Sequence, residues 1–408
     1  MHSIEKRTLL VSLINLALFQ TRKKMAVAYA IISILVASTA ASASQCFESI
    51  ISFGDSLADT GNFFLLSPPN KPPYCARPPY GRTFFHLPTG RSSDGRLVID
   101  FIAEALGLPL VESYIAGKNA AEKGGRFSKG VNFAVAGATV LDTVFFDKRG
   151  IHNRVTNVTL GTQFDWFNQF LAVIPNGRKF VKNSLILVGE IGGNDYGNPL
   201  LLDIDPKAIR SFMPAVVNYI GSTIEELIKL GATTMLVPGV IPMGCLPALL
   251  THYKTSSTEK DYHPTTGCLN WLNELSIYHN ELLQKELSRL RHLHPHIAII
   301  YADNYNAMMR FYLSPHQFGF AKESILRACC GGGGPYNFNG SALCGNLPRA
   351  NCCENPSLYV NWDGLHCTEA ANKWIAQGLW EGSYTHPHIK TICPSISSPA
   401  GFQYHHYY

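Results

Sequence analysis

A parallel β-sheet covered by helices on both of its faces is the architecture that we expect for this chain of 408 residues. Short apolar runs, each about as long as one strand, recur along the sequence. Longer segments carry apolar residues at helical spacing, and each of them precedes such a run. Strands that alternate with helices in this way pair in parallel, because each helix carries the chain back to the start of the next strand. The pattern therefore predicts an α/β fold.

The expected strands are almost entirely apolar, as strands that are buried on both faces usually are. They cover residues 49–53, 184–188, 234–237 and 297–301. Two long amphipathic helices are expected at 208–230 and 272–293, and Gly231 follows the first of them, where a helix often ends. A last helix is expected at 368–379, with Thr368 as its cap and Glu369 in its first turn.

Two short motifs, far apart in the chain, carry the groups that serine-based acyl transfer needs. Ser56 follows the first expected strand in the sequence Phe-Gly-Asp-Ser-Leu, so it lies past a carboxyl end, where open α/β sheets bind ligands. Asp363 and His366 are three residues apart in Trp-Asp-Gly-Leu-His, a spacing that brings both side chains to one side of a turn. The carboxylate can accept the Nδ1 proton and leave Nε2 facing Ser56. Hydrolysis of an ester is the leading hypothesis.

The motifs resemble those of the plant GDSL esterase/lipases of the SGNH hydrolase superfamily, over nearly all of residues 46–394. That superfamily has four catalytic groups in chain order, Ser, Gly, Asn and His. The resemblance assigns them here to Ser56, Gly137 in Asn-Phe-Ala-Val-Ala-Gly-Ala-Thr, Asn194 in Gly-Glu-Ile-Gly-Gly-Asn-Asp-Tyr, and His366 with Asp363. It implies a three-layer α/β/α sandwich of the flavodoxin-like kind. Gly130 lies on the same stretch as Gly137 and is the alternative for the second group.

Attack on an ester carbonyl produces a negative oxygen that needs preorganised donors. The backbone N–H groups of Ser56 and Gly137 and the side-chain amide of Asn194 are the expected donors, and a glycine permits close approach of the backbone to a substrate. This chemistry requires no metal and no cofactor. The Gly-x-Ser-x-Gly motif of α/β-hydrolase lipases is absent from the sequence, which argues against that fold.

Composition favours a single globular domain over residues 44–408, since 46% of the chain is hydrophobic, 15% is charged, and no linker or repeat divides it. Residues 1–43 contribute +4 of the net charge of +5, which leaves +1 for the remainder. A nearly neutral body gives no reason to expect nucleic acid or an anionic membrane surface as a partner.

Residues 1–43 are expected to be an N-terminal extension and a signal peptide. Three basic residues at 22–24 precede the apolar run 26–36, and small residues follow up to Ala43, near which we expect cleavage. Translation from Met25 is an alternative to translation from Met1. A retained signal anchor is the other alternative, although neither apolar run reaches the ~18 residues that a spanning helix needs. The protein is therefore expected to be secreted, to the extracellular space, the vacuole or another secretory compartment, without stable membrane insertion.

Eleven cysteines, all beyond the expected cleavage point, fit an oxidising compartment. Six of them lie between Cys329 and Cys367, and we expect a disulfide-stapled loop that supports the segment from Asp363 to His366. Spacing does not determine the pairing, and an odd total leaves at least one thiol unpaired. If that thiol is Cys367, it could line the site and react with thiol reagents. Sequons at Asn157 and Asn339 predict N-glycosylation.

The expected substrate is a small-molecule ester. Segments at 88–96 and 261–269 look like the family branch that contains sinapine esterase and acetylajmalan esterase, which implies an acetyl or phenolic ester of a secondary metabolite. Three alternatives are a lipase for longer acyl lipids, an acyltransferase that uses the same acyl enzyme, and a binding protein without activity. The proline-rich and aromatic segment 70–80 is expected to be either a wall of the substrate pocket or a rigid surface loop.

Overall fold

The computed structural model describes residues 46–121, 127, 129–152 and 155–394 of the chain. Within these ranges the residues from Cys46 onward form one compact unit. The expected extension and signal peptide at 1–43 lie outside the described residues.

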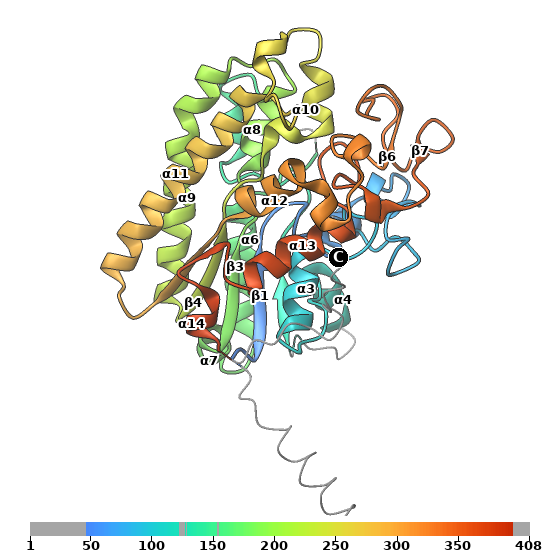
Figure 1. Cartoon of the computed structure of the whole chain (residues 1–408). Coiled ribbons are helices and arrows are strands. Elements are labelled where there is room, and N and C mark those ends of the chain that lie inside the picture. Colours follow the sequence, from blue (N-terminus) through green and yellow to red (C-terminus); the bar gives the residue numbers. More distant parts are fainter. Residues whose placement is uncertain (1–45, 122–126, 128, 153–154, 395–408) are drawn as a thin grey trace, which may run out of the picture. The chain divides into compact units, whose positions relative to one another are not determined.

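A six-stranded sheet lies at the centre of the described unit (Figure 1). Its spatial order is β2 (Gly130–Asn132), β1 (Ser49–Phe53), β3 (Ser184–Val188), β4 (Thr234–Pro238), β5 (Ala298–Ala302) and β8 (Thr385–His386). The strands from β1 to β5 run parallel, and the order 2-1-3-4-5 is the flavodoxin-like one. Strand β8 pairs antiparallel with β5 at one edge. The predicted α/β fold is confirmed, with β2 and β8 as additions that the sequence pattern did not predict.

Helices cover both faces of this sheet. The longer ones are α6 (Leu160–Val173), α9 (Pro206–Lys229), α11 (Asn270–Leu293), α12 (Asn304–Leu313) and α13 (Glu369–Trp380). The shorter ones are α2 (Asn62–Leu66), α3 (Val98–Ala105), α4 (Tyr114–Ala121), α5 (Thr143–Asp147), α7 (Gly177–Lys182), α8 (Gly193–Leu200), α10 (Pro247–His252) and α14 (Ile389–Ile392). Single 3₁₀ turns occur at Tyr74–Ala76, Met243–Cys245, Glu259–Asp261, Pro315–Phe318, Lys322–Ser324 and Pro356–Leu358.

Side chains of the central strands identify which helices lie on which face. Phe53 of β1 packs edge-to-face on Phe167 of α6, with ring centroids 5.4 Å apart. Phe53 is in register with Val188 of β3, so the preceding Leu187 points to the opposite face. There Leu187 meets α3 and α13, at a small cavity that Ile102 and Leu379 also line. Helix α3 packs on α13, and α9 packs on α11 (Figure 1).

The predicted long helices are confirmed, with small shifts at their ends. Helix α9 begins two residues earlier than expected, because Asp205 caps it by accepting a hydrogen bond from the Lys207 N–H and Pro206 takes the first helical position. Helix α11 likewise begins at Asn270. Helix α13 has the expected cap, since the Thr368 hydroxyl accepts a hydrogen bond from the Ala371 N–H.

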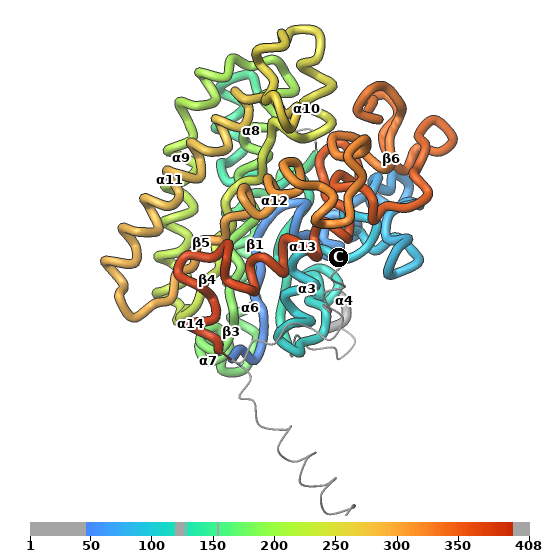
Figure 2. The backbone as a smooth tube through the Cα atoms, viewed as in Figure 1, coloured from blue at the N-terminus to red at the C-terminus, as the bar shows by residue number. Residues whose placement is uncertain are grey.

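Segments from the two ends of the described chain lie side by side. The loop region 74–94, drawn in blue tones, runs along 328–369, drawn in orange and red (Figure 2). Hydrogen bonds join them, among them one from Arg82 to the Cys353 carbonyl and one from Arg77 to Asn346. Strands β6 (Cys330–Gly331) and β7 (Asn351–Cys352) form a small second sheet in the later segment. This pairing places the region 74–94 against the segment that carries the second sequence motif.

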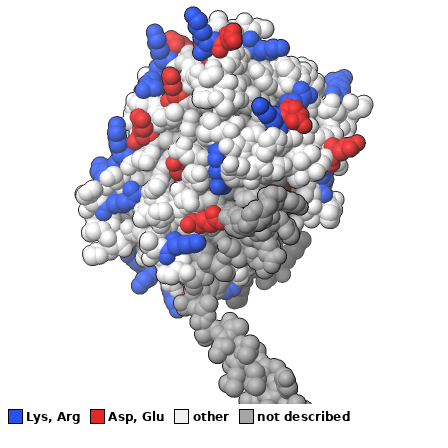
Figure 3. All heavy atoms as spheres, viewed as in Figure 1, with Lys and Arg blue, Asp and Glu red and all other residues white. Residues whose placement is uncertain are grey.

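Acidic and basic side chains are interspersed on the face that Figure 3 shows, without a large area of one sign. That agrees with the nearly neutral charge calculated for the chain beyond residue 43. Among the described helices, none is both long enough and apolar enough to cross a bilayer.

Candidate active site

Ser56, His366 and Asp363 form one continuous chain of hydrogen bonds. The Ser56 Oγ lies 2.8 Å from the His366 Nε2. The His366 Nδ1 lies 2.8 Å from the Asp363 Oδ2 and 2.9 Å from its Oδ1. Ser56 is 8% exposed and His366 5% exposed, so this group is largely shielded from water. The structure thus brings together the three residues that the two sequence motifs singled out.

The loop that carries Asp363 and His366 is a tight turn just before α13. Its closing hydrogen bond runs from the Trp362 N–H to the His366 carbonyl, at 2.7 Å. Within the turn, the Asp363 Oδ1 accepts hydrogen bonds from the Leu365 and His366 N–H groups, at 2.8 and 2.9 Å. These bonds orient the carboxylate toward the imidazole. The three-residue spacing therefore works through a turn and not through a helix.

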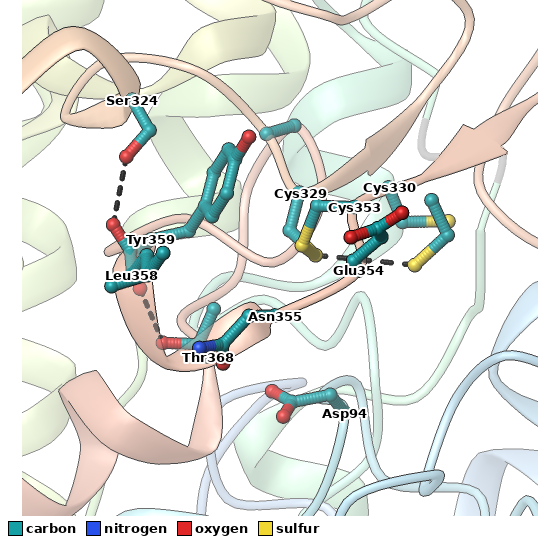
Figure 4. Close-up of a disulfide and its surroundings, with 12 residues drawn as sticks. Asp94, Ser324, Cys329, Cys330, Cys353, Glu354, Asn355, Leu358, Tyr359 and Thr368 are labelled. Carbon is teal, nitrogen blue, oxygen red and sulfur yellow. Dashed lines mark hydrogen bonds between the residues drawn. A yellow bond between two sulfur atoms is a disulfide. The ribbon is translucent and has the colours of Figure 1, made fainter. Parts of the chain in front are cut away.

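Two disulfides hold the strand segment behind this loop, as the cysteine cluster predicted. Cys329 pairs with Cys353, and Cys330 with Cys344. The Cys330 N–H donates to the Trp362 carbonyl at 2.7 Å, directly before Asp363. Figure 4 shows the Cys329–Cys353 bridge near the chain that leads through Leu358 and Tyr359 toward Thr368. Two further bridges join Cys46 to Cys393 and Cys245 to Cys268.

Cys367 contradicts the expectation of an accessible thiol beside the site. It is unpaired, as are Cys75 and Cys352, but it is only 3% exposed and does not line the substrate pocket. Its Sγ points toward Met308 of α12, at 3.9 Å from the sulfur of that residue. Burial raises the pKa of the Cys367 thiol far above its ordinary value, so the nucleophilic thiolate is disfavoured. The prediction of a reactive Cys367 is therefore wrong.

Two tyrosines of the 70–80 segment contact the group from behind, and sequence reasoning did not assign them this place. Tyr74 stacks on the His366 ring, with centroids 6.2 Å apart and an interplanar angle of 26°. Tyr80 donates a hydrogen bond to the Asp363 Oδ2, at 2.7 Å. Neither lines the pocket, so the expectation of a pocket wall is wrong, and the segment is a partly exposed loop whose two tyrosines reach the catalytic group. The aromatic content of this segment was the only feature of the sequence that pointed to a place near the site.

The pKa of His366 is raised and that of Asp363 is lowered. Burial disfavours the charged form of His366, but the Asp363 carboxylate and, to a smaller degree, that of Asp55 outweigh it and raise the His366 pKa above 6.5. Burial acts on Asp363 in the opposite sense, and the His366 charge with the hydrogen bonds to the carboxylate lowers the Asp363 pKa overall. Asp363 is therefore ionised at neutral pH, while His366 can take up and release a proton.

The turn that bears Ser56 is fixed from two sides. The Gln163 side chain of α6 accepts a hydrogen bond from the Gly54 N–H and donates one to the Gly54 carbonyl, at 2.9 and 2.8 Å. A Cβ at Gly54 would lie 2.9 Å from the Glu190 carbonyl oxygen, which explains the glycine. The Asp55 N–H donates to that same oxygen at 2.8 Å.

Asp59 clamps the turn of Ser56 to the segment of Gly137. Its carboxylate accepts four backbone N–H groups, from Gly61, Asn62, Phe63 and Ala136, at 2.7 to 3.0 Å. Despite these bonds, burial raises the Asp59 pKa to about 6. We refer to this arrangement as the Asp59 clamp.

Gly137 follows the Asp59 clamp directly and has a φ of +81°, which favours glycine. A Cβ there would lie 2.3 Å from the Cγ1 of Val155, so the position also lacks room for a side chain. The alternative glycine, Gly130, lies instead in β2, where a Cβ would lie 2.4 Å from the Ile50 carbonyl oxygen of β1. Strand pairing accounts for Gly130.

Asn194 lies in the first turn of α8, just past the carboxyl end of β3. Its side-chain amide donates to the Ala138 carbonyl at 3.0 Å and to the Asp55 Oδ2 at 3.3 Å. The first bond joins it to the residue after Gly137, and the second to the residue before Ser56. The four groups expected from the resemblance therefore converge at the carboxyl ends of β1 and β3.

A pocket opens beside Ser56 and His366. Apolar side chains form most of its walls, among them Ile191, Leu201, Val240, Ile241, Leu246 and Leu249. Its polar residues include Asp55, Glu190 and Asn194, and the described lining contains no lysine or arginine. A pocket of this character suits a largely apolar molecule.

Three more carboxyl groups are buried near the site with raised pKa values. Burial is the main cause in each, and it raises the pKa of Asp55 to about 7, of Asp195 to about 7 and of Glu190 to about 8. Asp195 accepts the N–H groups of Val140 and Leu141, whereas the Glu190 Oε2 has no hydrogen-bond partner among the described residues. Both predicted sequon residues, Asn157 and Asn339, are exposed.

A flavodoxin-like sheet with a serine, histidine and carboxylate at the carboxyl ends of its strands is the arrangement of a serine hydrolase. Comparison with known proteins narrows this class. The family described as GDSL-like lipase/acylhydrolase matches residues 50–379. The chain belongs to this family and is a carboxylic ester hydrolase, so both expectations from the sequence are confirmed.

Several curated relatives are about half identical to this chain. One GDSL esterase/lipase of Arabidopsis thaliana is 49% identical over 89% of this chain and 92% of its own length. The sinapine esterase of Brassica napus is 48% identical over 90% of this chain and 93% of its own length. Among solved structures, the acetylxylan esterase Axe2 of Geobacillus stearothermophilus matches over 82% of this chain and 93% of its own, at 13% identity and a TM-score of 0.33. These last values are too low to inform on substrate.

Proposed function

We propose that Ser56 is the nucleophile of this hydrolase and His366 its general base. Asp363 orients the imidazole and stabilises its protonated form. The distance of 2.8 Å between the Ser56 Oγ and the His366 Nε2 is the observation that carries the proposal. His366 removes the hydroxyl proton as Ser56 attacks the ester carbonyl, then returns it to the departing alcohol. A water molecule, activated by the same imidazole, releases the acyl group from Ser56.

The negative oxygen of each tetrahedral intermediate is held by the N–H groups of Ser56 and Gly137 and by the Asn194 amide. Asn194 already points between the segments of the other two donors, which supports this assignment. Its bond to Asp55 is long, at 3.3 Å, and therefore weak. We expect that amide hydrogen to turn to the oxyanion when substrate binds.

The substrate that we propose is a small acetyl or phenolic ester of a secondary metabolite. The pocket beside Ser56 is lined mostly by apolar side chains, which suits the apolar parts of such an ester. The described lining offers no basic side chain to pair with the phosphate of a phospholipid. The relative named sinapine esterase supports a phenolic ester further.

We also propose that the protein is secreted and glycosylated. Four disulfides in the described residues fit an oxidising compartment. The exposed side chains of Asn157 and Asn339 are accessible to glycosyl transfer in the secretory pathway.

Turnover of p-nitrophenyl acetate by Ser56→Ala tests the mechanism. We expect a loss in kcat of about 10⁴- to 10⁶-fold, as for other serine hydrolases. Ser222→Ala, which removes an exposed hydroxyl on α9, is the matched control and should keep the native rate. Near-native rates from Ser56→Ala would refute the assignment. A panel of choline, phenolic, acetyl and long-acyl esters, compared by kcat/KM with added alcohol acceptors, then tests the substrate class and separates hydrolysis from acyl transfer.

A further inference from the structure

Tyr80 makes a contact with the catalytic group that the mechanism above does not use. Its hydroxyl lies 2.7 Å from the Asp363 Oδ2, the same oxygen that lies 2.8 Å from the His366 Nδ1. We propose that Tyr80 is a positioning residue of the reaction, which holds the Asp363 carboxylate toward His366 and takes up part of its negative charge. The inference rests on the proposed roles of Ser56, His366 and Asp363.

The Tyr80 hydroxyl can act only as a donor toward Asp363. Burial, together with the charge of Asp363, raises the Tyr80 pKa well above its ordinary value, so the phenol stays protonated throughout the range in which the enzyme would be assayed. An ionised carboxylate is acceptor-only. The contact is therefore a charge-assisted hydrogen bond from Tyr80 to Asp363, of the stronger kind.

The ring of Tyr80 is held so that the hydroxyl has one place to point. The side chain is 2% exposed and packs edge-to-face on Trp362, with centroids 5.7 Å apart. Tyr74, which itself stacks on His366, leans against its other side at 5.7 Å. Two residues later, Arg82 fastens the segment by donating to the carbonyls of Cys353 and Glu354, at 2.7 and 2.8 Å. This packing makes the contact with Asp363 a built feature of the fold.

With the Tyr80 hydroxyl in place, hydrogen bonds occupy all the acceptor sites of the Asp363 carboxylate. Its Oδ1 receives two backbone N–H groups, from Leu365 and His366, and its Oδ2 receives the Tyr80 hydroxyl. The imidazole N–H lies within reach of both oxygens. Without the phenol, Oδ2 would be tied only to His366, and the plane of the carboxylate could turn about the Cβ–Cγ bond of Asp363. Tyr80 thus adds the second point that fixes the carboxylate plane.

The phenol also affects the proton affinity of His366. The positive end of its O–H dipole points toward the pair. It therefore stabilises the state with neutral His366 and charged Asp363, of net charge −1, more than the state in which both are charged, of net charge zero. It therefore lowers the affinity of His366 for a proton and opposes the effect of Asp363. Removal of the hydroxyl should raise the His366 pKa further above 6.5. A simple loosening of the site would do the reverse, because water would return the value toward 6.5.

Other ionisable groups near the pair must be considered, because pH is the readout. Asp55 acts on His366 and, with a pKa of about 7, titrates in the same range. Asp59, Asp195 and Glu190, with pKa values of about 6, 7 and 8, titrate in this range as well. The other neighbours have pKa values raised by burial and stay neutral; they are Tyr74, Cys75 and Cys367. All of these groups remain in every variant below. A difference between variants therefore reports on Tyr80.

The test is the pH profile of kcat/KM for Tyr80→Phe between pH 5 and 9. We expect kcat/KM on the plateau to fall about 10- to 100-fold, as for the loss of a hydrogen bond to a charged group. The acid limb, which reports the base of the free enzyme, should move to higher pH by about 0.5 to 1 pH unit. Tyr253→Phe is the matched control, since it loses a hydroxyl bonded to the Leu200 carbonyl away from Asp363. Its acid limb should stay in place.

A second variant keeps the shape of the side chain, in case Tyr80→Phe folds poorly. Incorporation of a fluorinated tyrosine at position 80 makes the phenol a stronger donor at almost unchanged volume. The acid limb should then move to lower pH, opposite to its movement in Tyr80→Phe. Limbs that stay in place in both variants, or that move toward 6.5 in both, would overturn the proposal and leave Tyr80 a packing residue.

Labelling by a fluorophosphonate probe separates this outcome from a failure of the proposed mechanism. If the wild-type protein labels at Ser56 but the acid limb does not respond to position 80, the role of Tyr80 is wrong and the mechanism stands. If the wild-type protein does not label at Ser56, the proposed mechanism itself is wrong.

Discussion

Replacement of Glu190 by glutamine should change how the stability of this protein depends on pH. Burial raises the pKa of Glu190 from 4.5 to about 8, with the neighbouring Asp55 as a further cause, and the Glu190 Oε2 has no hydrogen-bond partner among the described residues. A carboxyl group whose pKa is raised by folding contributes fully to the free energy of unfolding below its unfolded pKa, here 4.5. This contribution is lost as the pH rises from there through the folded pKa of about 8. Glutamine has a similar shape and carries no proton to lose.

The size of the effect follows from the difference between the ordinary pKa of Glu190, 4.5, and its raised pKa of about 8. At pH 7, about 2.5 pH units above the ordinary value, the buried carboxyl costs on the order of 3 kcal/mol relative to pH 4.5. Glu190→Gln should therefore gain about 3 kcal/mol over the wild type between pH 4.5 and 7. Any constant effect of the amide on packing cancels in this comparison, because only the change with pH is used.

Urea unfolding with intact disulfides, followed by tryptophan fluorescence at pH 4.5, 5.5 and 7, measures this change. Glu259→Gln alters an exposed glutamate and is the control, for which we expect no comparable change with pH. A stability difference between Glu190→Gln and the wild type that is the same at all three pH values would show that Glu190 is not held neutral by burial. The reasoning on the buried carboxyls would then fail.

Three further predictions follow from the site and the loop behind it. Asn194→Ala should lower kcat for p-nitrophenyl acetate by about 10²- to 10³-fold with little change in KM, because an oxyanion donor acts mainly in the transition state; a main effect on KM would contradict that role. Thr368→Ala should lower the unfolding free energy by about 1 kcal/mol, measured in urea, since it removes the cap of α13. In the native protein, iodoacetamide should leave Cys367 unmodified in peptide mass analysis while urea exposes it, and rapid native alkylation would contradict its burial.

Much of the fold could be predicted from the sequence because its central elements are long or strongly apolar. The strand β3 is an apolar run after its first residue, β1 is buried throughout, and α9 repeats apolar residues over many turns, so local pattern and buried position agree. Strand β8 has only two residues and thus no periodicity that a sequence pattern could reveal. Its pairing with β5 depends on how the chain returns after α13.

The site was predictable to the extent that its groups lie in short motifs. Asp363 and His366 are neighbours in the chain, and one turn suffices to join them. The contact of Tyr80 with Asp363 spans 283 residues and exists only after the loop region 74–94 packs on the disulfide-stapled segment. Cys367 was misjudged for a related reason: adjacent residues in an extended chain point to opposite sides, so a neighbour of His366 faces the core.

The Asp59 clamp separates the positioning of the nucleophile from the shaping of the substrate pocket. It locks the nucleophile turn to the neighbouring glycine segment, whereas apolar walls of the pocket come from Leu201, just after α8, and from the stretch around Leu246 and Leu249. Reshaping those walls therefore need not displace the reacting atoms. For directed evolution, Leu201 and Leu249 are natural places to begin when a bulkier ester is to be accommodated.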